Sequence, residues 1–315
     1  MARKTIRIRE VGPREGIQTV PNLLSTELKV ELLNDLVASG VREINAVSLV
    51  NPRVLPQMAD AEAVLKSFGA HEDLEVSALA PNRRALVRAF PLREANLIHK
   101  IFLIHAMSDA VIRANGVGIS REENLNTVLE LAAQAKSGGL QTAVFVSAAF
   151  GCSVDGEISP EDVITTVLEM GNESSLDEII VSDSTGQGNP RQVSYMFAEL
   201  AARGWGDRLL GLHLHDTRGA GLANAVAAID SPIENLVLDT SFGGLGGDVP
   251  FIPEAAGNIA TEDVVIMLDG MGIGTGIDAQ GIIDAGRRFS LAAEFPLNSK
   301  TPAVGPVRWQ RKPTL

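Results

Sequence analysis

The sequence predicts an α/β fold, a (β/α)8 barrel formed by a single domain with a C-terminal extension. Eight short apolar stretches alternate with longer helical patterns from one end of the chain to the other. Strands that alternate with helices pair in parallel through right-handed crossovers, and eight such units close into a barrel. The length of 315 residues also fits, since one barrel typically needs ~250 residues or more.

The predicted strands are apolar enough to be buried on both faces, as the strands of a parallel barrel are. They are spaced roughly evenly along the chain, with room for a helix after each. In chain order they are TIRIREVG (5–12), REINAVSLV (42–50), LEVSALAP (74–81), HKIFLIHA (99–106), QTAVFVSAA (141–149), DEIIVSDST (177–185), LLGLHLHD (209–216) and NLVLDTSFGG (235–244).

The segments between the strands show helical patterns, for example over 25–40, 121–138 and 159–171. In the last of these, we expect Ser159 to cap the helix and Pro160 to take its first position. No proline-rich or serine-rich linker divides the chain, so we predict one barrel domain over 1–290. The tail over 291–315 is basic and irregular, and either forms a plain surface segment or lies over a site.

Composition limits the compartment and the partners. No apolar run is long enough to span a bilayer, and the first residues pass directly into a strand pattern, unlike a signal peptide. Cys152 is the only cysteine, which excludes an internal disulfide. We therefore expect a cytoplasmic protein that does not bind membranes. The net charge of −12 argues against nucleic acid as a partner, and the sequence leaves a homo-oligomer open.

Two of the five histidines, His213 and His215, lie one residue apart in an apolar run. Residues i and i+2 of a strand share a face, so both rings point the same way. Imidazole is the commonest metal ligand, although two core histidines with satisfied hydrogen bonds would give the same pattern. The barrel favours the metal site, because chemistry gathers where barrel strands end, and both histidines end the seventh strand.

Glu15 follows the first strand and Asn258 precedes a helical segment, so both fall on the same rim as the histidines. Taken alone, Glu15 could simply pair with Arg14, and Asn258 could simply cap a helix. Together with His213 and His215 they form a set of nitrogen and oxygen ligands without a thiolate. Such a set suits a divalent ion such as Mg²⁺, Mn²⁺ or Co²⁺.

Other polar residues fall near this rim. Asp183 ends the sixth strand, where it is placed to take a proton from a substrate hydroxyl, or else is a turn aspartate that binds local backbone amides. Asp216 points away from the histidines by strand alternation, so we favour a supporting role for it. Cys152 and His105 are expected to be packing residues. The glycines over 243–247 allow a loop to approach a ligand closely, as a lid or as a plain turn.

Several segments resemble, in order, the motifs of the hydroxymethylglutaryl-CoA lyase family of metal-dependent TIM-barrel lyases and aldolases. EVGPREGIQ (10–18) is similar to the family's opening motif, and NPRVLPQMAD (51–60) to its second-strand loop. LHLHDTRGAGLANAVAAID (212–230) is similar to the histidine-strand motif. GGLGG (243–247) with AGNIATEDVVIML (256–268) is similar to the closing motif. The resemblance covers nearly the whole chain.

The resemblance implies a carbon–carbon lyase of the EC 4.1.3 type, which splits a tertiary 3-hydroxyacyl-CoA into acetyl-CoA and a keto product. It implies a divalent metal, Mg²⁺ or Mn²⁺, held by Glu15, His213, His215 and Asn258. It further implies Asp183 as the base, Arg14 as the stabiliser of the enolate oxygen, and Asp248 as the acid that protonates the enolate carbon. Contacts with the substrate or CoA are implied for Gln18, Asn45, Asn298 and Lys300.

Four residues depart from the family pattern. The metal-binding aspartate of the family is Glu15 here, and a glutamate at the end of the second strand is Asn45. The cysteine that donates a proton is Asp248, and a lysine near the first loop is Pro21. Because these changes surround the reacting centre, two alternatives stay open beside hydroxymethylglutaryl-CoA or a related 3-hydroxyacyl-CoA. One is the same barrel acting as an aldolase on a hydroxy acid without CoA, and the other is a non-catalytic, metal-binding paralogue.

Overall fold

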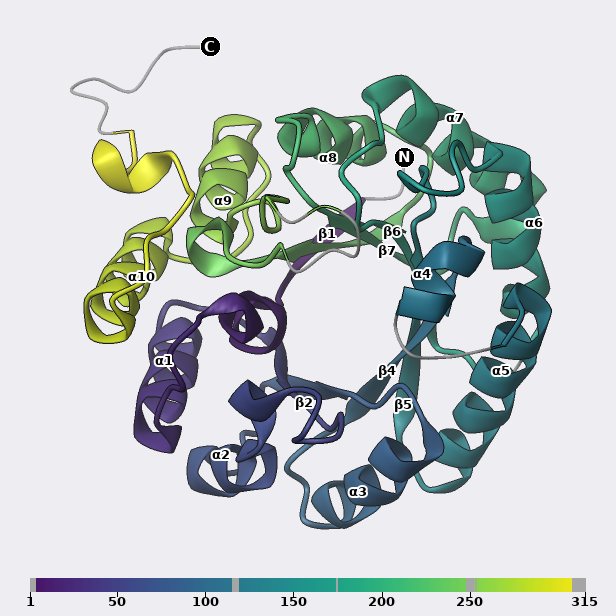
Figure 1. Cartoon of the computed structure of the whole chain (residues 1–315). Helices are drawn as coiled ribbons and strands as arrows, with labels where there is room; N and C mark the ends of the chain where they lie inside the picture. The colour runs from purple at the N-terminus through teal and green to yellow at the C-terminus, as the bar shows by residue number, and fades with distance from the viewer. Residues whose placement is uncertain (1–3, 115–118, 174, 248–251, 253, 308–315) are drawn as a thin grey trace.

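The computed structural model describes residues 4–114, 119–173, 175–247, 252 and 254–307. Its strands form a closed parallel barrel in the order β1-β2-β3-β4-β5-β6-β7-β8, surrounded by helices (Figure 1). β1 closes the barrel on β8 with an unbroken register from Thr5 opposite Asn235 to Glu10 opposite Thr240. The predicted fold class is confirmed.

Each predicted strand segment contains one observed strand, and the observed strands are shorter because loop residues at their ends do not pair. The strands are β1 (Thr5–Glu10), β2 (Glu43–Ser48), β3 (Glu75–Leu79), β4 (Lys100–Ala106), β5 (Gln141–Ser147), β6 (Glu178–Asp183), β7 (Leu209–Leu214) and β8 (Asn235–Thr240). Most of their residues are buried, as the continuous apolar runs indicate.

Helices connect the strands and cover the outside of the barrel (Figure 1). They are α1 (Thr26–Ala38), α2 (Ala61–Phe68), α3 (Arg83–Glu94), α4 (Asp109–Ala114), α5 (Arg121–Ser137), α6 (Pro160–Gly171), α7 (Pro190–Leu200), α8 (Gly221–Ile229), α9 (Thr261–Gly270) and α10 (Ala279–Ala293). Short helical turns are η1 (Gly12–Gly16), η2 (Ile17–Thr19), η3 (Pro56–Met58), η4 (Ala201–Trp205), η5 (Phe242–Gly244) and η6 (Thr301–Ala303). In the described part of the chain, no helix is long and apolar enough to cross a membrane.

The predicted helix ends can be compared with the observed ones. Pro160 begins α6 as predicted, and Ser159 occupies the cap position. Its side chain makes no capping hydrogen bond, however, and because this residue is exposed, water is available to the free amides of the first turn. Ser25 does cap α1, with its hydroxyl accepting a hydrogen bond from the backbone amide of Leu28.

The C-terminal segment lies against the rim of the barrel. α10 continues to Ala293, and the predicted boundary at residue 290 stays a prediction. The backbone amides of Asn298 and Ser299 donate to the carbonyl oxygen of Gly243 in η5, at 2.7 and 3.1 Å. The segment therefore covers the loop that follows β8, at the end of the barrel where the polar candidates gather.

Candidate metal centre and active site

Loops and strand ends from opposite parts of the chain bring three candidate ligands together. η1 carries Glu15 to the rim beyond β1, while His213 and His215 stand at the end of β7. One potential ligand atom from each of the three lies within 4.8 Å of the other two, and all three residues are buried. The sequence predicted that both imidazoles lie on one face of the strand. Their ring centroids are 5.2 Å apart, which confirms that they lie side by side.

Hydrogen bonds set the orientation of both rings. Glu15 Oε1 lies 2.9 Å from His215 Nε2 and 3.3 Å from His213 Nε2. On the other side, His215 Nδ1 is 3.2 Å from the carbonyl oxygen of Ala256, and His213 Nδ1 is 3.2 Å from Asp239 Oδ2. Carbonyl and carboxylate oxygens only accept, so each Nδ1 presents a hydrogen to its partner, and each Nε2, which faces a carboxylate oxygen as well, presents one as long as no ion is bound. The Nε2 atoms are thereby directed at the shared carboxylate, where an ion would bind.

Asn258 completes the cluster. Its Nδ2 lies 3.3 Å from Glu15 Oε1, whereas its Oδ1 is buried and accepts no hydrogen bond from the described residues. A buried amide oxygen without a donor, beside two imidazoles and a carboxylate, fits a divalent cation. The alternative role as a helix cap is wrong, because the N-cap position of α9 is occupied by Ala260. Gly246, with φ of 124°, makes room here, since a Cβ would lie 2.9 Å from Asn258 Nδ2.

The charges around the cluster determine the protonation state of Glu15. Burial works to raise the pKa of Glu15, but the charges of His213 and Arg14 hold this pKa well below its usual range. Burial also lowers the pKa of His213, but Glu15 and Asp239 outweigh that effect and raise it to about 9. The Glu15 carboxylate is therefore ionised at neutral pH, and a bound ion would take the place of the protons that the imidazoles present to it.

Asn45 orients Arg14. Arg14 Nε donates to Asn45 Oδ1 at 2.6 Å, and Asn45 Nδ2 donates to Ser77 Oγ at 3.1 Å. Arg14 Nη2 lies 2.9 Å from Glu15 Oε2, yet this buried atom makes no directed hydrogen bond within the described part of the chain. An uncharged partner at position 45 holds the guanidinium without neutralising it. Arg14 thus keeps a donor for an oxyanion formed beside Glu15.

Asp183 ends β6 and is only 1% exposed. Its Oδ1 and Oδ2 accept hydrogen bonds from the backbone amides of Gln187 and Gly188, each at 2.9 Å. These are the contacts of a turn aspartate, one of the two alternatives from the sequence. Burial nevertheless raises the pKa of Asp183 against the opposing effects of those amides and the nearby histidines. A raised pKa is the direction that a general base at neutral pH needs.

The residues expected to contact the substrate or CoA lie around the same rim. Gln18 is in η2, half-buried on the loop after β1. Asn298 and Lys300 are exposed, and together with Asn258 they line a cavity of about 360 Å³. Asp248, the expected proton donor, lies outside the described residues.

Three residues have supporting contacts, as the sequence suggested. Asp216 Oδ1 accepts the amide hydrogen of Gly221 at 2.8 Å, away from the histidines. His105 Nδ1 is 3.0 Å from Asn124 Oδ1 of α5, and burial lowers the pKa of His105 to about 4. Cys152 is buried in a small apolar cluster with residues of α4.

Sequence reasoning missed Asp239. This aspartate lies within the eighth predicted strand and had no predicted role, although it accepts the Nδ1 hydrogen of His213. The signal that would have found it is register, since Asp239 of β8 pairs directly with His213 of β7. Register between neighbouring strands cannot be read from either strand alone.

Comparisons with known proteins show which family the chain belongs to. The HMGL-like family model matches residues 5–288. A relative named (R)-citramalyl-CoA lyase, from Chloroflexus aurantiacus, is 36% identical over 314 residues, covering 96% of each chain. A hydroxymethylglutaryl-CoA lyase of Bacillus subtilis is 34% identical over 301 residues, covering 96% of this chain and 97% of the relative.

A solved structure shows the same architecture. It is that of a hydroxymethylglutaryl-CoA lyase from Acinetobacter baumannii in complex with coenzyme A and 3-methylmalate. The TM-score is 0.84 at 31% identity, and the match covers 98% of this chain and 97% of that one. With the family model matching nearly the whole chain, the chain belongs to the hydroxymethylglutaryl-CoA lyase family of carbon–carbon lyases.

Proposed function

We propose that this protein is a divalent-metal-dependent lyase that cleaves a 3-hydroxyacyl-CoA, of the hydroxymethylglutaryl-CoA or citramalyl-CoA type, into acetyl-CoA and a keto product. The observation that carries the proposal is the buried cluster of Glu15, His213 and His215, beside which the amide oxygen of Asn258 has no hydrogen-bond partner among the described residues. The names of the relatives support a CoA thioester as the substrate.

The four clustered residues would hold the ion through one carboxylate, two imidazole nitrogens and one amide oxygen. This donor set suits Mg²⁺ or Mn²⁺. When bound, such an ion is a Lewis acid, which makes a hydroxyl easier to deprotonate near neutral pH. Glu15 is one methylene longer than the aspartate that the family resemblance implies, and its Oε1 faces both histidine Nε2 atoms.

Cleavage then needs a base, an oxyanion stabiliser and an acid. Asp183 takes the proton from the tertiary hydroxyl, whose carbon becomes the ketone as the carbon–carbon bond breaks. The electron pair of that bond passes into the thioester as an enolate, and Arg14 Nη2 donates to its oxygen. Asp248 returns a proton to the enolate carbon, which gives acetyl-CoA.

The CoA part of the substrate is assigned to the cavity that Asn298 and Lys300 share with Asn258. One wall of this cavity belongs to the ligand cluster and another to the C-terminal segment, so a thioester bound here reaches from the rim to the reacting atoms. Gln18, on the loop after β1, would contact the acyl part. Asn45 of β2 was also expected to contact it, but it is fully buried and bonded to Arg14 and Ser77, so it would act on the substrate through Arg14. The coenzyme A in the complex of the similar structure supports a CoA thioester as the substrate, while its assignment to this cavity rests on the lining residues.

The test is acetyl-CoA release from hydroxymethylglutaryl-CoA and from citramalyl-CoA, each with Mg²⁺ or Mn²⁺ and again after chelation. We expect release from at least one thioester, lost with the chelator and restored by added metal. Cleavage of the free hydroxy acids but not of the thioesters would favour the aldolase alternative. Bound metal with no cleavage of any of them would favour the non-catalytic paralogue.

Asp248→Asn tests the proposed proton donor. The amide cannot donate an acidic proton, so we expect turnover to fall by ~10²-fold or more, with little change in KM. Asp248→Cys is the matched variant, since it introduces the donor that the family resemblance implies, and we expect it to remain active. Unchanged turnover in Asp248→Asn, measured by acetyl-CoA release, would remove this residue from the mechanism.

A further inference from the structure

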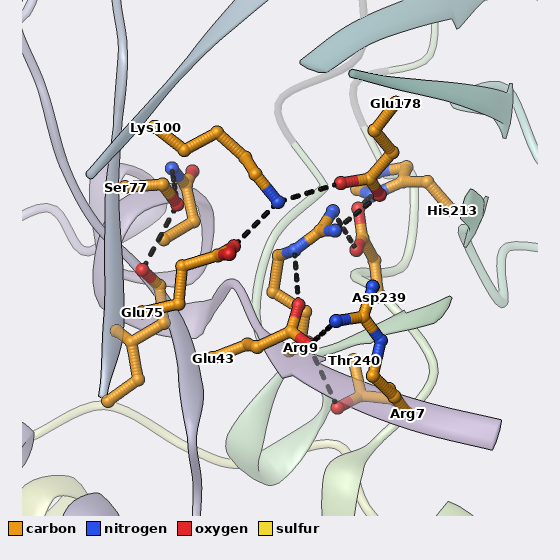
Figure 2. A network of polar contacts seen from close by, with 12 residues as sticks. Arg7, Arg9, Glu43, Glu75, Ser77, Lys100, Glu178, His213, Asp239 and Thr240 are labelled. Carbon is orange, nitrogen blue, oxygen red and sulfur yellow. Dashed lines mark hydrogen bonds and ion pairs between the residues drawn. The ribbon is translucent and has the colours of Figure 1, made fainter. Parts of the chain in front are cut away.

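Three polar residues stand at one level across neighbouring strands beneath the ligand cluster. In the barrel register, Arg9 of β1 lies opposite Asp239 of β8, and Asp239 lies opposite His213 of β7. The Asp239 carboxylate is shared between its two neighbours. Its Oδ1 accepts from Arg9 Nη1 at 3.0 Å, and its Oδ2 lies 3.2 Å from His213 Nδ1, as Figure 2 shows.

Arg9 is itself held in place by ion pairs inside the barrel (Figure 2). It pairs with Glu178, and its Nε lies 3.6 Å from Glu43 Oε2. Glu178 also accepts from Lys100 Nζ at 3.0 Å. The side chains of Arg9, Glu178 and Asp239 are at most 1% exposed, so none of them can turn towards bulk solvent.

The network around Arg9 contains more carboxylates than cations. The connected groups are the cations Arg7, Arg9 and Lys100 and the carboxylates Glu43, Glu75, Glu178 and Asp239. The network therefore contains three cations and four carboxylates, an excess of one negative charge. The Nδ1 hydrogen of His213 is the further donor that binds to a carboxylate of this network, that of Asp239. Buried carboxylates need such donors.

We propose that Asp239, held by Arg9, is a positioning residue for the metal centre. It keeps the hydrogen of His213 on Nδ1 and fixes the ring so that Nε2 faces Glu15 Oε1. This role rests on the proposed metal-dependent function. His215 needs no such side chain, because the backbone carbonyl of Ala256 faces its Nδ1. A side-chain substitution at the Nδ1 partner can therefore disturb the orientation of His213, but not that of His215.

Asp239→Asn tests the proposal with almost no change in volume. A carboxylate accepts from both Arg9 and His213, but an asparagine has one accepting oxygen, and its NH₂ group would face the other donor. One of the two neighbours then loses its acceptor. We expect the Kd for Mn²⁺ to rise by ~10–100-fold, measured by titrating the metal-free protein and following free Mn²⁺ by electron paramagnetic resonance.

Glu43→Gln is the matched control. Glu43 belongs to the same network and faces Arg9, but it has no contact with His213. We expect both variants to lower the midpoint of thermal unfolding, and only Asp239→Asn to change the Kd for Mn²⁺ by more than about twofold. If Asp239→Asn does not fold, Arg9→Lys serves instead, because one ammonium group cannot bind Glu178 and Asp239 as the guanidinium does. For this variant we expect a smaller rise, of roughly three- to tenfold.

Equal Mn²⁺ affinity in the wild type and Asp239→Asn, with the same fall in unfolding midpoint as in Glu43→Gln, would overturn the positioning role. In Arg9→Lys, an unchanged affinity would do the same. Absence of Mn²⁺ binding by the wild-type protein is a different result. It would overturn the metal centre itself, and the inference with it.

Discussion

His215→Ala is expected to abolish tight binding of Mn²⁺ and to lower turnover by roughly 10³-fold, which corresponds to about 4 kcal/mol of transition-state stabilisation. The reason is geometric. His215 Nε2 is the imidazole nitrogen nearer to Glu15 Oε1, at 2.9 Å, and alanine leaves a buried carboxylate facing one remaining histidine. We expect the same direction for His213→Ala. Elemental analysis of the purified variants and acetyl-CoA release measure the two effects.

The control for this prediction is His71→Ala. His71 contacts Phe68, the last residue of α2, and has no contact with the ligand cluster. The chemical change is the same, so metal content and turnover should remain close to those of the wild type. Stoichiometric metal in both His213→Ala and His215→Ala would show that the ion is held elsewhere.

Asp183→Asn is expected to lower kcat by ~10²–10⁴-fold while KM changes little, because the amide cannot take a proton from the hydroxyl. The pH dependence follows from the direction of the pKa shift. Burial raises the pKa of Asp183 above its usual range, and the base acts only when ionised. Activity at saturating metal should therefore rise with pH through that raised pKa, and this limb should disappear in the variant.

Asp216→Asn is the matched control, since Asp216 is a neighbouring rim carboxylate that accepts from the Gly221 amide instead of facing the histidines. We expect its kcat to stay within about tenfold of the wild type. A pH profile and a kcat for Asp183→Asn that match those of the wild type would assign the proton transfer to another group. The two backbone amides bound to Asp183 would then explain its burial fully.

Much of the fold was readable from local pattern. The strand that carries the two histidines was visible as an apolar run with two polar residues on one face. β7 ends at Leu214, so it includes His213, and His215 follows it directly. Glu15 and Asn258 could be assigned to the same rim from their places after one strand and before one helix. These assignments need only periodicity and the rule that barrel strands end at a common face.

The contacts of Asp183 and Asn258 could not be predicted from local pattern. For each residue the sequence allowed a local role and a role at the site. The structure shows Asp183 bonded to local amides yet buried near the histidines. Asn258 is removed from the cap position by two residues, with an unpaired oxygen at the cluster. The contacts of these two residues depend on donors and acceptors from other segments of the chain. The local sequence around either residue does not contain that information.

The barrel, the paired imidazoles and the types of ligand available could be predicted from the chain alone, because hydrophobic periodicity and residue chemistry are local properties. The ring nitrogen that faces Glu15, and the sharing of the Asp239 carboxylate between Arg9 and His213, follow only from contacts between distant segments. Arg9 and Asp239 are 230 residues apart in the chain. They meet because the barrel closes β1 on β8 in one register, and that register follows from packing around the whole barrel.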